Sequence, residues 1–437
     1  MRARRVWQQG RGAVAALALV GWLHARPAAA QMPMGGTPVN VGVVCTTRPG
    51  TSPTFELSTE QGYVQLPDGN TMYMWGFSAA GQGFQHPGPV LCVNEGDLVT
   101  VVLRNTFTRP VSIIFPGQDN VLAGGVPAQP QGVGGALRSL TNEAPPGGSV
   151  SYSFVASRPG VFLYESGTDP ATQVRMGLFG ALVVRPAMGA EHANAREDSR
   201  FTPSEEFMVL LSEIDPYQHQ AVEGGVPFDL RTYQARYWLL NGRGFPDTMA
   251  DNFAAWLPTQ PYGALARIHA FNADPDAGVN YHPNPGRAEY LNVGTENFPF
   301  HPHGNNGVVI SRDGRPLAGP AGQDLSFEKF AFNIGPGQTW DVLFKWFDAE
   351  HYDPVNNPVP VELPNIANQT YGMYYGGSPY LGVMGPMPPG MNSLNQCGEY
   401  YIISHNHALN QITSWGAVMT GPVTYLRIDP PLPNECP

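Results

Sequence analysis

The sequence predicts an all-β protein with two domains. Its 437 residues include 51 glycines and 44 prolines, and only 14% of them are charged. This composition is typical of a turn-rich chain with many short strands and few helices. Apolar or alternating runs bounded by Gly, Pro and Asn recur along the chain. Helical periodicity is absent except weakly over residues 247–257. The length suits two domains of ordinary size, or three small ones.

Residues 40–186 are predicted to form the first domain. Strand-like runs follow one another along it, separated by turn residues. The clearest of these runs are residues 90–93, 97–103, 150–154, 160–164 and 180–184. A polar stretch rich in charged and small residues comes next, so residues 187–205 are predicted to be a linker.

Residues 206–430 are predicted to form the second domain. The domain opens with the apolar run 207–211. At about 225 residues it is large for a single β-sandwich. The surplus lies in two loop-like regions, residues 245–285 and 351–396, and the second is dense in Pro, Gly, Asn and Tyr. Loops of this length usually serve as functional lids, interface arms or disordered segments.

Residues 1–30 are predicted to be a cleaved export signal. Three arginines lie within the first five residues, and the apolar run 13–23 is too short to span a membrane. The small residues 27–30 predict cleavage before Gln31. An arginine pair near the start also resembles a twin-arginine signal. We therefore expect a periplasmic or secreted protein without a membrane partner.

Four cysteines in an exported chain predict disulfide bonds. They are Cys45, Cys92, Cys397 and Cys436. An even number of cysteines outside the cytoplasm favours pairing over metal binding or catalysis. Three pairings are compatible with the sequence.

Two His-x-His pairs are the strongest chemical signal in the chain. His301 and His303 form the first pair, and His405 and His407 form the second, about a hundred residues later. Residues i and i+2 of a strand point to the same face, so each pair projects two imidazoles in one direction. If the two strands are neighbours, four imidazoles converge, and imidazole is a good ligand for copper, zinc, nickel and iron. The sequence therefore predicts a metal site at these four residues.

Other chemistry is weakly represented. The net charge of -11 argues against a nucleic-acid partner, which would require a basic surface. No nucleophile elbow, P-loop or dinucleotide fingerprint occurs. The remaining histidines are isolated in the sequence and are expected to be surface or core residues rather than ligands. Those considered are His86, His192, His219, His269, His282 and His351.

Several motifs, in their order along the chain, resemble the multicopper oxidase family. They cover residues 160–173, 177–184, 240–243, 297–304, 313–314 and 336–338. The number of domains is similar to that of two-domain laccases and copper nitrite reductases. The resemblance implies two cupredoxin-like Greek-key β-barrel domains and copper as the cofactor.

The chain departs from the family at several copper-binding motifs. The family's His-Trp-His-Gly motif corresponds to residues 113–117, which contain no histidine, and its His-Ser-His motif corresponds to Glu165-Ser166-Gly167. Three further ligand positions hold Phe298, Asn406 and Gln411. A blue-copper centre needs a cysteine thiolate and two histidines. The sequence therefore predicts no blue-copper centre, and four-electron reduction of dioxygen by the laccase mechanism is not expected.

The ligands that remain by this resemblance all belong to the second domain. They are His301, His303, His405 and His407, which suit a single metal ion or an incomplete pair. Glu165 occupies the place of a ligand histidine and is expected to be either a further ligand or proton donor, or a surface or capping carboxylate.

Three functions are compatible with these observations. The first is an exported copper oxidoreductase without a blue-copper centre, acting on a small-molecule substrate or dioxygen. The second is a non-catalytic copper-binding protein for storage, delivery or sensing. The third is a scaffold whose histidines are relics. In two-domain relatives the active copper lies between subunits of a trimer, so the resemblance also implies a homotrimer as one assembly for this chain.

Overall fold

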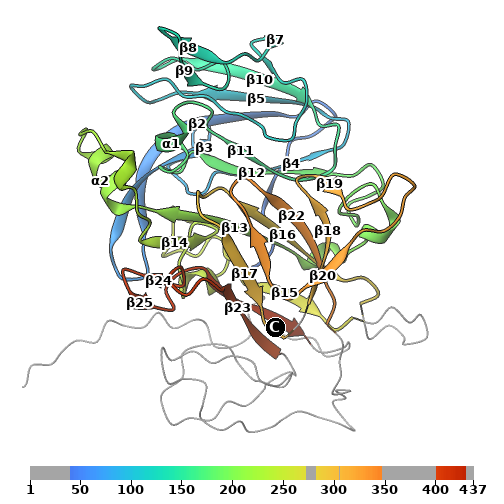
Figure 1. Ribbon diagram of the computed structural model, residues 1–437. Helices are drawn as coiled ribbons and strands as arrows, with labels where there is room; N and C mark the ends of the chain where they lie inside the picture. The colour runs from blue at the N-terminus through green and yellow to red at the C-terminus, as the bar shows by residue number, and fades with distance from the viewer. Residues whose placement is uncertain (1–39, 272–281, 305, 347–399, 430–437) are drawn as a thin grey trace, which may run out of the picture.

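The computed structural model describes residues 40–271, 282–304, 306–346 and 400–429, and most of their regular structure is β-strand (Figure 1). The all-β prediction is confirmed. The expected export signal at residues 1–30, the loop at 351–396, Cys397 and Cys436 lie outside the described residues. In the part that is described, no helix combines the length and apolar character needed to cross a membrane.

The strands up to Arg185 form two main sheets. The four-stranded sheet has the order β1 (Cys45–Thr46), β4 (Val90–Asn94), β12 (Phe179–Arg185), β11 (Gly160–Glu165). The six-stranded sheet has the order β3 (Thr71–Ala79), β2 (Thr54–Gln65), β5 (Leu98–Arg104), β10 (Ser149–Val155), β6 (Leu122–Ala123), β7 (Val126–Pro127). A small hairpin joins β8 (Gln131–Val133) to β9 (Ala136–Ser139). Cys45 and Cys92 form a disulfide that links β1 to β4.

The strands from Glu206 onward form a second pair of sheets. One has the order β14 (Tyr237–Leu240), β13 (Glu206–Ile214), β16 (Gly286–Asn292), β22 (Thr339–Phe344), β18 (Gly307–Arg312), β19 (Arg315–Pro316), with β20 (Phe327–Lys329) also paired to β18. The other has the order β15 (Ala266–His269), β26 (Val423–Asp429), β23 (Tyr400–Asn406), β17 (Phe298–Pro302), β21 (Phe332–Ile334). A hairpin joins β24 (Thr413–Ser414) to β25 (Ala417–Val418).

The two pairs of sheets share an apolar interface. Alternate residues of β11 serve different cores: Phe162 and Tyr164 pack inside the first pair of sheets, whereas Val161 and Leu163 face the second pair. Met208 of β13 belongs to the same interface cluster as Val161 and Leu163. Because β11 is buried on both faces, its sequence is a continuous apolar run rather than an alternating one.

The connecting segment 187–205 is partly packed against the sheets. His192, Asn194 and Phe201 are all buried, and the side chain of Asn194 donates a hydrogen bond to the hydroxyl of Ser311 at 2.8 Å. The segment contains two 3-10 turns, η1 (Glu197–Ser199) and η2 (Pro203–Glu205). Its polar composition therefore reflects local turns and buried hydrogen bonds, not a solvated tether.

The helical expectations need correction. The weak periodicity over 247–257 corresponds only to the 3-10 turn η4 (Asp247–Met249). The longest helix is α2 (Pro216–Glu223), which was not predicted. Its start carries a recognisable signal, because the Asp215 side chain caps the backbone N–H of Tyr217 at 2.9 Å and proline occupies the first turn. The other two short elements are α1 (Pro170–Gln173) and η3 (Leu230–Thr232).

A buried ion network crosses the junction between the two pairs of sheets. Arg185, at the end of β12, donates to both carboxylate oxygens of Glu206, at the start of β13, at 2.5 and 2.6 Å. Arg287 of β16 donates to Glu206 at 2.7 Å and to Asp341 of β22 at 2.6 Å. Burial opposes ionisation of Glu206, but Arg287 and Arg185 outweigh it and hold its pKa below the ordinary value.

Glu289 is the third carboxylate of this network. It lies 3.0 Å from Arg287 and is completely buried, and burial raises its pKa to about 8. A protonated Glu289 at neutral pH leaves two guanidinium groups facing two carboxylates, Glu206 and Asp341. The buried charges are therefore balanced without an external counter-ion.

We predict that Arg287→Met destabilises the protein strongly. The change leaves carboxylates in the core without their guanidinium partner, which typically costs about 3–5 kcal/mol of unfolding free energy. The matched control is Arg104→Met, which breaks the exposed 2.9 Å pair with Glu56 and should cost at most about 1 kcal/mol. Urea unfolding of both variants measures the difference, and equal losses would show that the network does not stabilise the fold.

Candidate metal centre

The pairing of β17 with β23 places the two His-x-His motifs side by side. The strands are antiparallel, and His301 lies directly opposite His405. In β17, Phe298 and Phe300 are buried in the core, so the alternation of side chains turns His301 and the following His303 to the other face. The same alternation in β23 buries the neighbours of His405 and turns its imidazole toward the histidines of β17.

The four predicted histidines form one cluster of rings. The ring centroid of His301 lies 4.4 Å from that of His303 and 5.3 Å from that of His407. The centroid of His405 lies 5.0 Å from that of His303 and 5.9 Å from that of His407. The structure therefore brings together all four of the histidines that the sequence singled out.

Backbone carbonyls orient two of these rings. Nδ1 of His301 donates to the carbonyl oxygen of Phe330 at 2.6 Å, and Nδ1 of His405 donates to the carbonyl oxygen of Asn406 at 2.8 Å. A histidine whose Nδ1 carries the hydrogen presents the lone pair of Nε2. Both rings are thus held in the tautomer that binds a metal through Nε2.

Two of the ring nitrogens already lie at the distance expected for two ligands of one metal ion. Nε2 of His303 lies 2.9 Å from Nε2 of His405. Two nitrogens bound at about 2.0 Å to one ion, at right angles, lie about 2.8 Å apart. The rings of His301 and His407 lie beside this pair, with the His301 centroid 4.4 Å from that of His303 and the His407 centroid 5.9 Å from that of His405.

The electrostatics of the cluster favour neutral imidazoles. Partial burial, together with the neighbouring rings of His301, His405 and His407, lowers the pKa of His303 to about 4. Burial also lowers the pKa of His405. Only the neutral ring binds a metal, so these two histidines are in the ligand-competent state at neutral pH.

Asn406 occupies the interior position between His405 and His407. It is buried, and its side-chain amide donates a hydrogen bond to the side-chain oxygen of Gln411. Gln411 in turn donates to the carboxylate of Glu296 at 2.6 Å. At the two positions where the resemblance places a thiolate and an imidazole, the chain has a buried amide network that suits no blue-copper centre.

The first comparison with known proteins concerns the amino-terminal half of the chain. Residues 58–188 match the sequence profile of the multicopper oxidase family. These residues form a multicopper oxidase domain. The matched region ends before the four histidines, so it supports the family resemblance and not the particular site.

Curated relatives agree with this assignment. The chain is 30% identical over 172 residues to the multicopper oxidase VdtB of Byssochlamys spectabilis, covering 37% of this chain and 23% of that protein. It is 26% identical over 231 residues to the copper-containing nitrite reductase of Neisseria gonorrhoeae, covering 52% and 51%. It is 28% identical over 172 residues to copper resistance protein A of Escherichia coli, covering 38% and 25%. The chain thus spans about a quarter to a half of the length of these relatives, which are named as copper proteins.

Solved structures support the fold. The blue copper oxidase of Nitrosomonas europaea is 20% identical, with a TM-score of 0.55, over 86% of this chain and 85% of that chain. The copper nitrite reductase of the same organism is 16% identical, with a TM-score of 0.50, over 89% and 96%. The predicted cupredoxin-like architecture is confirmed by these neighbours.

An open cavity of about 500 Å³ lies beside the histidine cluster. His301 and Phe330 form part of its wall, together with Glu328 of β20 and Lys345 just after β22. The wall thus combines an imidazole, a carboxylate, an ammonium group and an aromatic ring. This volume is large enough for a small-molecule substrate.

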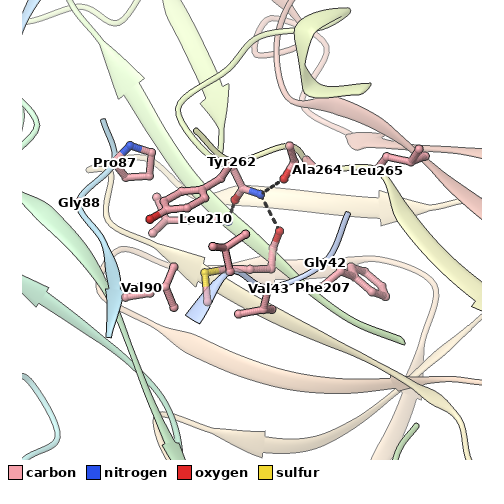
Figure 2. Close-up of a pocket in the computed structure, with 15 residues that line it drawn as sticks. Gly42, Val43, Pro87, Gly88, Val90, Phe207, Leu210, Tyr262, Ala264 and Leu265 are labelled. Carbon is pink, nitrogen blue, oxygen red and sulfur yellow. Dashed lines mark hydrogen bonds between the residues drawn. The ribbon is translucent and has the colours of Figure 1, made fainter. Parts of the chain in front are cut away.

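A second cavity, at the interface of the multicopper oxidase domain with the sheets that follow it, is a packing gap. Figure 2 shows Pro87, Val90, Phe207 and Leu210 among its lining residues. Its free volume is about 20 Å³, which holds about one water molecule. The Asn241 side chain donates to the backbone carbonyls of Met208 and Gly263 there and accepts from the backbone N–H of Leu210, so its polar atoms are satisfied within the protein.

Glu165 does not join the histidines of its own chain. It ends β11 in the multicopper oxidase domain and pairs with Phe179 of β12. In Figure 1, β11 lies in the upper half of the molecule, whereas β17 and β23 run to its lower edge. Burial raises the pKa of Glu165 to about 7, so its environment suits proton transfer, but a role at the histidines would require another subunit.

Sequence reasoning missed a second cluster. His269 and His282 were expected to be isolated, yet their rings stack with centroids 4.3 Å apart beside the carboxylate of Glu205. In the described ranges, these three residues alone bring three potential ligand atoms within 4.8 Å of one another. No local motif marks them, because they are 64 and 13 residues apart and meet only in the folded sheets.

We predict that Glu165→Gln changes the pH dependence of stability. The proton on Glu165 stabilises the folded state below the ordinary pKa of 4.5, and this contribution is lost as the pH rises through about 7. Glutamine mimics the protonated group at every pH. Relative to the wild type, the variant should gain up to about 3 kcal/mol of unfolding free energy between about pH 5 and pH 8.

Urea unfolding at both pH values measures this change. Glu56→Gln, at an exposed carboxylate, is the control for the loss of a surface charge. A Glu165→Gln variant whose stability parallels that of the wild type across this range would contradict the raised pKa.

Proposed function

We propose that the chain binds copper through His301, His303, His405 and His407 and acts as an oxidoreductase without a blue-copper centre. The observation that carries the proposal is the convergence of four imidazoles, with two Nε2 atoms 2.9 Å apart. Copper is the metal named for the relatives, and imidazole nitrogens are among its preferred ligands. Bound copper would accept one electron from a reducing substrate and pass it to an oxidant such as dioxygen.

The chain's own residues provide the binding and positioning. The carbonyls of Phe330 and Asn406 fix the rings of His301 and His405, so that their Nε2 atoms remain available. The cavity beside His301 gives a small-molecule substrate direct access to the cluster, with Glu328 and Lys345 on its wall. Since Asn406 replaces the thiolate of a blue-copper centre, electrons would come directly from the substrate.

A non-catalytic role is the second candidate. The similarity to copper resistance protein A favours binding of copper for storage, delivery or sensing. Such a protein would hold copper at the same four histidines and would show no turnover with reducing substrates. Export fits either role, and it rests on the predicted signal at residues 1–30.

We predict that the double variant His303→Ala/His407→Ala loses most of its bound copper and remains folded. His303 and His407 are exposed, so their removal leaves the core of the second pair of sheets intact. Elemental analysis of protein produced with copper measures the loss, and circular dichroism measures the fold. His192→Phe, at a buried histidine of the connecting segment, is the control. Unchanged copper content in the double variant would rule the proposed site out.

Wild-type protein from the same preparation also tests the lack of a blue-copper centre, the cleavage of the signal and the catalytic role. The wild-type visible spectrum should lack the intense thiolate-copper band, because the interior position holds Asn406. The intact mass should match a chain that begins at Gln31 if the signal is cleaved as proposed. Oxidation of a phenolic or metal-ion reductant by the copper-loaded wild type, lost in the double variant, would favour the oxidoreductase over the storage role.

We also propose that the chain assembles as a homotrimer, in which Glu165 of one subunit lies near the histidines of the next. The support is the separation of Glu165 from the histidines within one chain and the raised pKa of its carboxyl group. Closed cyclic symmetry is common among homo-oligomers. Sedimentation should give the mass of three chains at micromolar concentration, and the mass of a single chain would reject this arrangement.

A further inference from the structure

Three elements of the second pair of sheets meet at the carboxylate of Glu205. Glu205 ends the 3-10 turn η2, His269 ends β15, and His282 lies shortly before β16. Nδ1 of His269 lies 2.7 Å from Oε1 of Glu205, and Nδ1 of His282 lies 2.6 Å from the same atom. Glu205 is buried, and the two rings are partly buried.

Hydrogen bonds alone do not account well for this arrangement. The backbone N–H of His269 also donates to Oε1 of Glu205, at 2.9 Å. Three nitrogens therefore converge on one carboxylate oxygen, which has about two lone-pair sites. Nδ1 of His282 is buried and has no hydrogen bond of acceptable geometry despite its 2.6 Å contact. A cation that replaces the ring protons would satisfy both imidazoles and the carboxylate together.

A second carboxylate lies behind His269. β15 and β26 pair in parallel, with His269 opposite Asp429, and Nε2 of His269 lies 3.5 Å from Oδ2 of Asp429. Asp429 is itself held by the guanidinium groups of Arg267 and Arg427. A carboxylate beside the outer nitrogen of an imidazole is the usual partner of a metal-binding histidine, because it fixes the tautomer and makes the ring more basic.

This cluster is separate from the four histidines of the proposed copper site. β26 links the two places: Val423 pairs with His405 at one end, and Asp429 pairs with His269 at the other. Six residues of strand separate the two pairs, which corresponds to about 20 Å. The two clusters therefore cannot share one ion.

We propose that Glu205, His269 and His282 bind a divalent transition metal ion of the zinc class. Two imidazole nitrogens and one carboxylate oxygen are a ligand set that zinc accepts, with a fourth position for water. The ion would fasten the start of β13, through η2, to β15 and to the chain that enters β16. Its role would be to hold these sheet edges together, independently of the copper chemistry proposed above.

Zinc binding by the full-length chain tests this site. The background protein is His303→Ala/His407→Ala, which disables the four-histidine cluster. After removal of metal with a chelator and addition of Zn²⁺, it should retain about one zinc per chain through desalting and show a higher Tm than the zinc-free protein. Failure to retain zinc in this folded background would overturn the proposal.

Two variants of this background identify the ligands. His282→Phe keeps a ring to stack on His269 but removes both nitrogens, and it should weaken zinc binding at least tenfold and abolish the Tm increase. His192→Phe is the matched control, since His192 is a buried histidine whose ring nitrogens make no hydrogen bond. It should retain zinc as the background does. If His282→Phe fails to fold, Glu205→Gln replaces it with the same expected loss. Retention of zinc by a folded His282→Phe or Glu205→Gln variant would place the ion elsewhere and overturn the assignment.

Discussion

The buried ion network at the junction of the two pairs of sheets is the constraint on which the rest of the fold depends. Arg185 ends β12, the last strand of the first pair of sheets, and Glu206 begins β13, the first strand of the second pair. Their ion pair therefore holds the two ends of the connecting segment together. Arg287 then ties Glu206 to Asp341 across β16 and β22. A buried guanidinium with these partners tolerates little displacement, because any shift would leave a charge unpaired in a medium of low dielectric.

The alternation of side chains along β17 and β23 places the histidine cluster on the face of the sheet opposite the core. In β17, Phe298 and Phe300 hold the strand in the core, and the alternating position that follows them carries the imidazole of His301 on the other face. The register with β23 then sets His301 opposite His405. The histidine cluster therefore has little effect on the stability of the core, because its ligands occupy the face of the strands that points away from the core.

The parts of the structure that could be predicted from the sequence are those in which a residue type recurs at a fixed short spacing. Alternating and continuous apolar runs indicated the strands, and the i, i+2 spacing indicated that His301 and His303 would share a face. The cluster of Glu205, His269 and His282 has no such spacing, since it depends on the contact of β15 and of the chain before β16 with Glu205 in η2, 64 or more residues earlier in the sequence. The packing of the segment 187–205 could not be predicted from its composition, because buried partners such as Ser311 are distant in the sequence. The helix at 216–223 had a local signal, Asp215 followed by proline, but too few turns to show a helical period.

The buried amide of Asn406 has a consequence for the stoichiometry of any redox reaction at the four histidines. Asparagine and its partner Gln411 have no accessible redox state, so the buried position between His405 and His407 cannot accept or store an electron. A single copper ion there would exchange one electron in each encounter. A donor would then leave as a radical, and a product that needs two electrons would form only after a second encounter or by coupling of two radicals in solution. The chemistry of the released species, rather than that of the protein, would determine the final product.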